Sequence, residues 1–167
     1  MGPDPRDLAN SWIGAGAPLE DVSSCSAEQL ACLSYIAPVF PETVLASLEL
    51  AAKKPGFASR TNPSFAKVVR LLCQLAYDDA SFERATDLIL MFAETEAAGE
   101  RNNSVVGSMK HLFSLYLSGT EATPIRRQAY LAKLFRSSNA KHNEIAAELF
   151  HSALEASHWT SFSTFDF

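Results

Sequence analysis

The hydrophobic and polar positions over residues 63–97 recur with the spacing of two amphipathic helices. The first helix is apolar around most of its circumference, and its narrow polar stripe consists of Lys67, Arg70 and Gln74. The second helix separates an apolar face from an acidic one, and a short acidic turn at residues 78–79 joins the two. Because so little of the first helix is polar, we expect it to be covered on three sides.

Similar helix pairs are expected on both sides of this unit, because a lone pair leaves apolar surface on each flank. Ile36, Leu75 and Leu115 close matching segments and lie 39 and 40 residues apart, and Leu154 stands where a fourth copy falls. This period is near that of HEAT and armadillo repeats. The sequence therefore predicts an all-α fold, an α-solenoid of about seven main helices in stacked antiparallel pairs. The alternative is an irregular helical bundle whose hairpins are alike in length.

Helix-start signals divide the chain into units at about residues 26–54, 63–98, 104–136 and 140–157, within one domain covering 1–167. Ser26 and Gln29 have the spacing of a capping box ahead of an apolar run. Thr123 followed by Pro124 predicts an N-cap with proline at the first helical position.

Two further signals are expected to mark helix ends: one is the start of the central helix, and the other is the end of the helix after it. Asn62 followed by Pro63 has the same form as Thr123 followed by Pro124 and predicts the start of the central helix. Gly119 is expected to end the helix that begins near residue 105, so that Tyr116 belongs to its core face.

Composition places the chain among soluble globular proteins, with 47% hydrophobic and 20% charged residues in 167. No apolar run approaches the length of a membrane span, and the polar N-terminus lacks the pattern of a signal peptide, so a cytoplasmic location is predicted. Cys32 and Cys73 fall in helical segments and are expected to be small buried hydrophobes. The net charge of −5 argues against nucleic acid as a partner.

No catalytic or cofactor motif is present in the sequence, which carries no phosphate-binding loop, no nucleophile elbow and no H-E-x-x-H pattern. We therefore predict no enzymatic activity, no cofactor and no metal site. The last helix carries Glu148-x-x-His151 and Glu155-x-x-His158, the spacing used in di-iron proteins. Both pairs lie on one helix, two turns apart, which favours a solvated face. The alternative is a small helical enzyme or metal-binding protein that uses these residues.

Charge is distributed unevenly between two of the predicted helices. Residues 78–100 contain seven acidic residues and one base, whereas residues 124–141 contain five bases and no acid. These strips are either solvated faces that interact weakly with each other or a charged surface for a protein partner. The candidate surface consists of Glu83, Asp87, Glu94, Arg126, Arg127, Lys133 and Arg136.

Residues 105–167 carry a family resemblance. The segment HLFSLYLSGT at 111–120, the helix RRQAYLAKLF after Pro124, and ALEASHW at 153–159 resemble the helical region of large bacterial STAND-type signalling NTPases. In that family a P-loop NTPase module precedes helical repeats that sense a trigger, and the present chain has no such module. The resemblance implies a sensor or scaffold fragment of a longer bacterial protein, which binds a protein partner or other domains of the same parent chain.

The two ends of the predicted stack differ in what covers them. Trp12 and Ile13 are expected to cap the first unit. The last helix has no second helix to cover its apolar flank, which includes Phe150 and Leu154. Four closely spaced aromatic residues follow. Either they fold back and cap the open flank, or the chain is cut from a longer protein and they are disordered or held by a neighbouring molecule. They are Trp159, Phe162, Phe165 and Phe167.

Overall fold

The computed structural model describes residues 4, 7, 11–13, 16–97, 99, 104–116 and 118–155. Within this part of the chain the structure contains one 3-10 turn and seven α-helices, and it contains no strand, which confirms the all-α prediction. The elements are η1 (Val22–Ser24), α2 (Ala27–Ile36), α3 (Pro41–Ala52), α4 (Phe65–Leu75), α5 (Phe82–Glu94), α6 (Val105–Phe113), α7 (Pro124–Phe135) and α8 (Ala140–Leu154).

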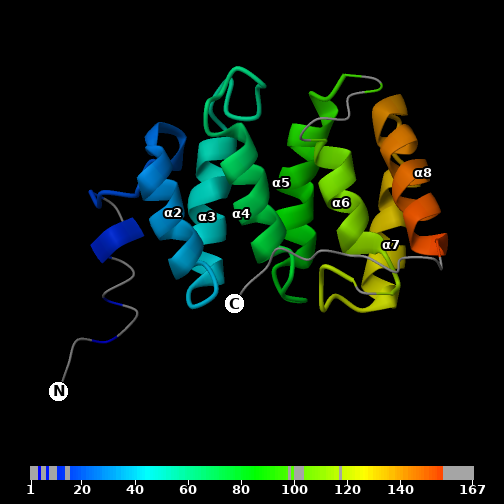
Figure 1. Ribbon diagram of the computed structural model, residues 1–167, viewed down its shortest axis with the longest axis horizontal. Helices are drawn as coiled ribbons and strands as arrows, with labels where there is room; N and C mark the ends of the chain where they lie inside the picture. Colours follow the sequence, from blue (N-terminus) through cyan, green and yellow to red (C-terminus); the bar gives the residue numbers. More distant parts are fainter. Residues whose placement is uncertain are drawn as a thin grey trace.

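The helices stand side by side in a row that follows chain order from α2 to α8 (Figure 1). Along one layer, α2 contacts α4, α4 contacts α6, and α6 contacts α8. In the other layer α3 contacts α5, and side chains join α5 to α7. Each helix therefore packs against helices close to it in the sequence.

Two predicted helix starts are confirmed in atomic detail. The Ser26 hydroxyl accepts a hydrogen bond from the Gln29 amide at 3.3 Å, and the Gln29 side chain accepts one from the Ser26 amide at 2.7 Å. At α7 the Thr123 hydroxyl accepts from the Arg126 amide at 3.3 Å, and Pro124 occupies the first helical position. Both starts depend on residues three apart, so the sequence alone specifies them.

The predicted start of α4 is wrong by two residues. The helix begins at Phe65, not at Pro63, and Asn62 is not its N-cap. The Asn62 carboxamide accepts a hydrogen bond from the Ser64 amide at 2.9 Å and donates one to the Phe57 carbonyl at 2.7 Å. Asn62 therefore closes the loop before the helix, an alternative use of a side chain that caps helices elsewhere.

The predicted course of α6 is also wrong, because this helix ends at Phe113. Leu115 and Tyr116 follow it with 58% and 62% of their surface exposed, so neither belongs to the core. The amide of Gly119 donates to the His111 carbonyl at 2.8 Å and folds the loop back against the helix. A β-carbon on Gly119 would lie 3.2 Å from that carbonyl oxygen, so the close approach favours glycine.

A buried carboxylate joins the end of α5 to the start of α6. Glu96 accepts hydrogen bonds from the Ser104 hydroxyl at 2.6 Å and from the amides of Val105 and Val106 at 2.7 and 3.0 Å. These amides belong to the first turn of α6, where a negative charge is favourable. The contact fixes the two helices to each other whatever the course of the chain between them.

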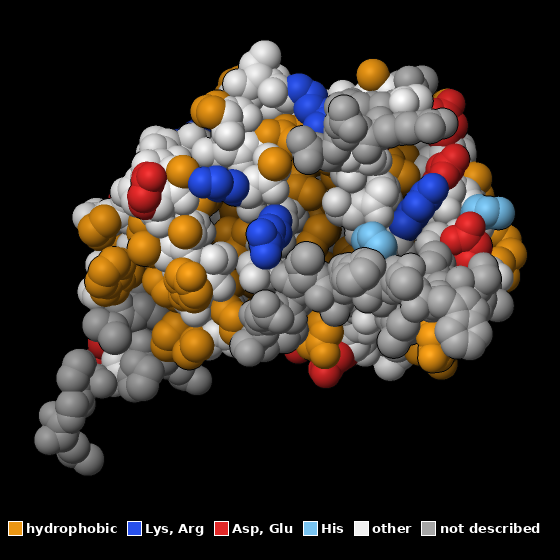
Figure 2. All heavy atoms as spheres, viewed as in Figure 1, with side chains coloured by type: hydrophobic (Ala, Val, Ile, Leu, Met, Phe, Trp, Pro, Cys, Tyr) orange, Lys and Arg blue, Asp and Glu red, His pale blue; other side chains and the backbone are white. Residues whose placement is uncertain are grey.

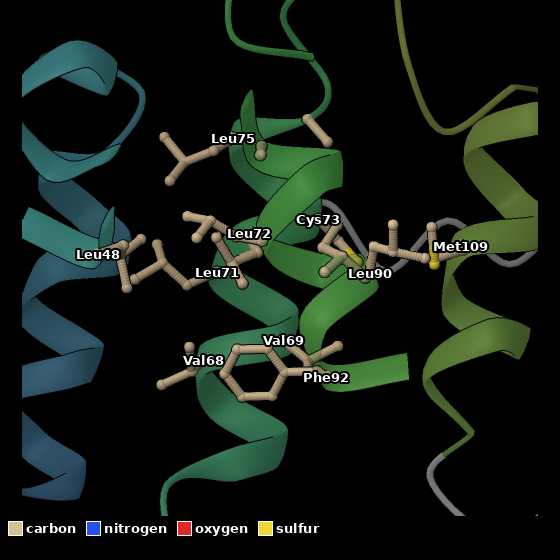
Figure 3. Packing of buried hydrophobic residues seen from close by; sticks show 14 of the residues in the cluster. Leu48, Val68, Val69, Leu71, Leu72, Cys73, Leu75, Leu90, Phe92 and Met109 are labelled. Atoms are coloured by element: carbon tan, nitrogen blue, oxygen red, sulfur yellow. The ribbon is translucent and has the colours of Figure 1, made fainter. Parts of the chain in front are cut away.

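The hydrophobic core runs along the row and includes clusters of aromatic rings. Phe82 of α5 lies 5.8 Å from the Phe113 ring and 6.1 Å from the Tyr130 ring, centre to centre. Three helices thus meet at one cluster. Around α4 and α5, Leu48 extends from α3 toward α4. On the opposite side, Met109 extends from α6 toward Leu90 of α5 (Figure 3).

The burial of the cysteines differs in part from the prediction. Cys73 is buried as expected, and burial raises the pKa of its thiol to about 12. Cys32 is exposed on α2, so the expectation that it is a core residue is wrong. Cys25 is buried beside the first helices, and burial raises the pKa of its thiol as well. No helix within the described residues combines the length and apolarity needed to cross a membrane.

Phe82→Ala tests the ring cluster that joins α5, α6 and α7. We expect this change to lower the free energy of unfolding by about 3–5 kcal/mol, because it removes a fully buried ring and leaves a cavity. Urea denaturation followed by far-UV circular dichroism measures the loss. Ile125→Ala, at a side chain that is 77% exposed, is the control and is expected to change it by less than about 0.5 kcal/mol.

Thiol reactivity tests the burial of the cysteines. When the native protein is treated at about pH 8 with a disulfide reagent that modifies thiols, we expect Cys32 to react quickly and Cys25 and Cys73 to react slowly. All three cysteines should react after denaturation. If the Cys32→Ser variant still contains a thiol that reacts quickly, the assignment of Cys32 as the exposed cysteine is wrong.

Candidate interaction surfaces

Charged side chains join α3 to α5 along the layer of second helices. Arg84 of α5 binds Glu49 of α3 through two hydrogen bonds, at 2.8 Å from Nε and 2.9 Å from Nη2. Its Nη1 also lies 2.5 Å from a carboxylate oxygen of Glu42. The hydrogen bond from Arg84 lowers the pKa of Glu49. The one base in the acidic stretch is therefore used within the fold.

A second set of charged contacts joins α5 to α7. The Lys133 amine lies 3.1 Å from Glu83 and 2.9 Å from both carboxylate oxygens of Asp87. Although burial works against its charge, hydrogen bonds to these two carboxylates raise the pKa of Lys133. The Tyr130 hydroxyl also donates to Asp87 at 3.0 Å, and burial together with that charge raises the pKa of Tyr130.

Two further contacts extend the boundary between the acidic and basic strips. Arg126 lies 3.2 Å from the Asp79 carboxylate and donates to the Asp79 carbonyl at 2.9 Å. Glu94 accepts a hydrogen bond from Asn139 at 3.1 Å and contacts the His142 ring. The two strips lie next to each other, and Arg126 and Lys133 of the basic strip are directed at carboxylates of the acidic strip. Glu83, Arg126 and Lys133 still expose about half or more of their side chains to solvent.

Arg127 is not part of this exposed surface, which corrects the sequence prediction. Only 7% of the residue is accessible, and its Nη1 donates to the Ser114 carbonyl at 2.7 Å and to the Ser118 hydroxyl at 3.1 Å. Burial lowers the pKa of its guanidinium. Neighbours on a helix point about 100° apart, so Arg126 and Arg127 face different sides of α7. Arg127 holds the loop that follows α6.

Arg136 lies at the C-terminal end of α7 and is exposed. Within the described part of the chain, no acidic side chain forms an ion pair with it. Of the exposed basic candidates, Arg136 is therefore the one without a carboxylate partner among the described residues of the acidic strip.

The glutamate and histidine residues of α8 contact their neighbours. Glu148 pairs with Lys110 of α6 at 2.5 Å, and His151 lies 3.2 Å from Glu155 one turn further on. His158 lies outside the described residues. Among the residues that are described, no three His, Cys, Asp or Glu side chains gather closely enough to hold a metal ion.

A groove between α2 and α4 was not predicted from the sequence. Its floor consists of Leu30 and Leu71, and one wall carries Lys67, Arg70 and Gln74 from α4. The sequence identified this polar stripe but gave no sign of the hollow beside it. Small residues of α2 form the opposite wall, and their size leaves the space open. They are Ala27, Ala31 and Ser34, and Tyr35 stands beside them.

The two ends of the row are covered differently. At the first end, Ile13, Leu19 and Val22 are buried against the core, so residues that precede α2 cover it. The expected cap therefore includes Ile13, whereas Trp12 is about half exposed. At the other end, the flank of α7 and α8 is apolar and partly exposed. The predicted role of the aromatic tail lies outside the described residues.

The exposed flank at the second end has a defined composition. Phe150 and Leu154 of α8 expose 48% and 65% of their surface, whereas Leu149 points into the core. The Phe150 ring packs edge-on against Phe135 of α7, with ring centres 6.4 Å apart. We refer to Phe135, Phe150 and Leu154 as the end face.

No protein family, curated protein or solved structure matches the chain.

Arg127→Met tests the buried role of that residue. We expect it to lower the free energy of unfolding by about 1.5–3 kcal/mol, because the Ser114 carbonyl loses a hydrogen bond from a charged donor. Methionine preserves much of the apolar stem, so the loss reports the hydrogen bonds. Arg126→Met is the matched control and should cost less than about 1 kcal/mol in the same urea titration. Equal effects of the two changes would contradict the assignment.

Proposed function

We propose that the chain is a non-catalytic protein-interaction or sensor segment built on helical repeats, and part of a larger bacterial signalling protein in the cytoplasm. Its partner is a protein or another domain of the same parent chain. The family resemblance of residues 105–167 motivates the signalling context. The arrangement of the helices and the composition of the end face support the interaction role.

The contacts between helices favour a solenoid over an irregular bundle. First helices contact first helices through α2, α4, α6 and α8, and second helices follow one another through α3, α5 and α7. Leu33, Leu72 and Leu112 occupy matching positions 39 and 40 residues apart, and all three are buried. A repeated unit that contacts only its neighbours is the defining property of HEAT-like and armadillo-like stacks.

The difference between the two ends is the observation that carries the proposal. Residues before α2 cover the first unit, whereas the end face exposes two phenylalanine rings and a leucine. Repeat stacks need a cap at each end, since an uncovered flank is apolar. The end face therefore suits a further helical unit, which would continue the packing by which α8 already covers α6 and α7.

Site-specific photo-crosslinking in the host cell tests this function. A photoreactive phenylalanine derivative replaces Phe150 on the end face and, as a control, Tyr116 in the loop after α6, which is similarly exposed. We expect illumination to join position 150, but not position 116, to one defined protein or to another segment of the parent chain. Leu154→Ser should reduce that product by about tenfold, because it removes apolar area from the contact.

Two outcomes would contradict the proposal. In one, position 150 gives no product above the unilluminated sample, so the end face has no protein neighbour. In the other, positions 150 and 116 give the same products in the same amounts, which indicates random collision.

A further inference from the structure

We propose that α7 and α8 together bind one amphipathic helix of the partner, which carries an apolar stripe and a carboxylate that pairs with Arg136. This inference rests on the proposed function and names the structure and the chemistry of what covers the end face. It follows from the way in which α5 contacts the unit after it. The two helices α7 and α8 stand at the outer end of the row (Figure 1).

One side of α5 is occupied by the unit that follows it. Glu83 and Asp87 bind the Lys133 amine of α7, and Glu94 contacts residues at the start of α8. Leu90 belongs to the same stripe and is buried. The four positions of α5 are four, three and four residues apart, a spacing that places them along one side of a helix.

A stripe with the same spacing is uncovered on α7. Arg84 of α5 faces α3 and Arg126 of α7 faces α5, so corresponding positions of the two helices are 42 residues apart in the sequence. Ile125, which corresponds to Glu83, is 77% exposed, and the other three positions are exposed or half-buried. We refer to these four residues as the outer stripe of α7. They are Ile125, Ala129, Ala132 and Arg136.

Phe150 of the end face extends this uncovered surface to α8. It follows the fully buried Leu149, as Phe113 follows the buried Leu112 in α6. The second helix of its own unit covers Phe113, because the Tyr130 ring of α7 lies 5.9 Å from it, centre to centre. Among the described residues no second helix follows α8, and Phe150 is 48% exposed. One helix beside the outer stripe would cover both.

The chemistry of the outer stripe selects the partner helix. On α5 the stripe presents three carboxylates, whereas on α7 it consists of one isoleucine, two alanines and one arginine. The small alanines let a second helix approach closely, and Ile125 and Phe150 provide apolar area. Arg136 is exposed and has no carboxylate partner among the described residues of the acidic strip. A carboxylate on the bound helix would pair with it, since arginine can bind a carboxylate through two hydrogen bonds.

The face formed by the first helices is less suited to an apolar helix. Charged and histidine side chains gather over α8 on this face, and hydrophobic atoms reach the surface at the outer end of the row (Figure 2). The charged residues of α8 pair with neighbours, as Glu148 does with Lys110 and His151 does with Glu155. Covering these charges with apolar surface is unfavourable. The bound helix is therefore directed to the outer end.

Selection from a random peptide library tests the proposal on the full chain. Displayed peptides of about 18 residues are long enough to form a helix on binding, and they are selected on the wild-type protein and sequenced. We expect enriched peptides to carry large apolar residues three or four positions apart, together with an acidic residue near one end. The best peptide should gain helical circular dichroism signal when it binds.

A matched pair of variants locates the bound helix. Ile125→Asp should weaken binding of the best peptide by about tenfold or more in a fluorescence anisotropy titration, because it places a charge in the apolar contact. Val39→Asp is the control, at an aliphatic side chain that is 65% exposed in the turn after α2. It should change the dissociation constant by less than about twofold.

A charge reversal tests the pairing with Arg136. Arg136→Glu should weaken binding by about fivefold, and a peptide with lysine in place of its acidic residue should bind this variant more tightly than it binds the wild-type protein. Lys53→Glu, at the exposed C-terminal end of α3, changes the net charge equally. This control should leave the affinity within about twofold.

Three results would overturn the proposal. The first is a set of enriched peptides that show no helical spacing and gain no helical signal on binding. The second is equal weakening by Ile125→Asp and Val39→Asp, which places the peptide elsewhere. The third is a concentration-dependent dimer of the wild-type protein in sedimentation equilibrium that Ile125→Asp abolishes, which assigns the surface to a second copy of the chain.

The outcomes separate this inference from the proposed function. If position 150 crosslinks to a protein in the cell but the library yields no helical peptide, the interaction role stands and the helical partner is wrong. If helical peptides bind as expected but position 150 gives no crosslink, the proposed function is wrong and the surface is still specific for a helix.

Discussion

The fold depends on the need to cover α4 on nearly all sides. A helix that is apolar over most of its circumference is stable only when neighbours remove that surface from water. Here α2, α3, α5 and α6 supply the cover, and Val68, Leu72 and Leu75 are almost inaccessible as a result. Each covering helix then has an apolar flank of its own. The row of helices is the solution in which every such flank but those at the ends meets another helix.

Local signals in the sequence were sufficient where structure depends on residues a few positions apart. Ser26 and Gln29 determine the start of α2, and Thr123 does the same for α7, because each cap closes within one turn. The end of α6 could not be predicted in this way. Leu115 and Tyr116 keep the helical spacing of apolar residues, but the helix stops because the loop after it is held from elsewhere. That support comes from tertiary contacts, which override local preference.

The candidate surfaces were predicted unevenly for the same reason. The acidic and basic strips were predicted from the order of charged residues along the sequence. They are neighbours because successive second helices lie next to each other. Which charges remain available did not, because Arg127 is buried by a loop whose course is set by α6. The groove between α2 and α4 was missed because it results from the small size of residues on one helix, opposite a polar stripe on another. Such a groove exists only when the two helices pack together, so the sequence of either helix alone does not indicate it.

Two kinds of contact join the second helices of the row, and they differ in how they respond to the solvent. Partly exposed ion pairs such as Lys133 with Asp87 and Arg84 with Glu49 join these helices, and the buried rings of Phe82 and Tyr130 meet between α5 and α7. Dissolved ions screen exposed charges strongly and apolar contacts hardly at all. Rising ionic strength is therefore expected to weaken the ion pairs more than the ring contact. The contribution of these ion pairs to stability is therefore expected to depend on the salt around the protein, whereas that of the buried rings is not.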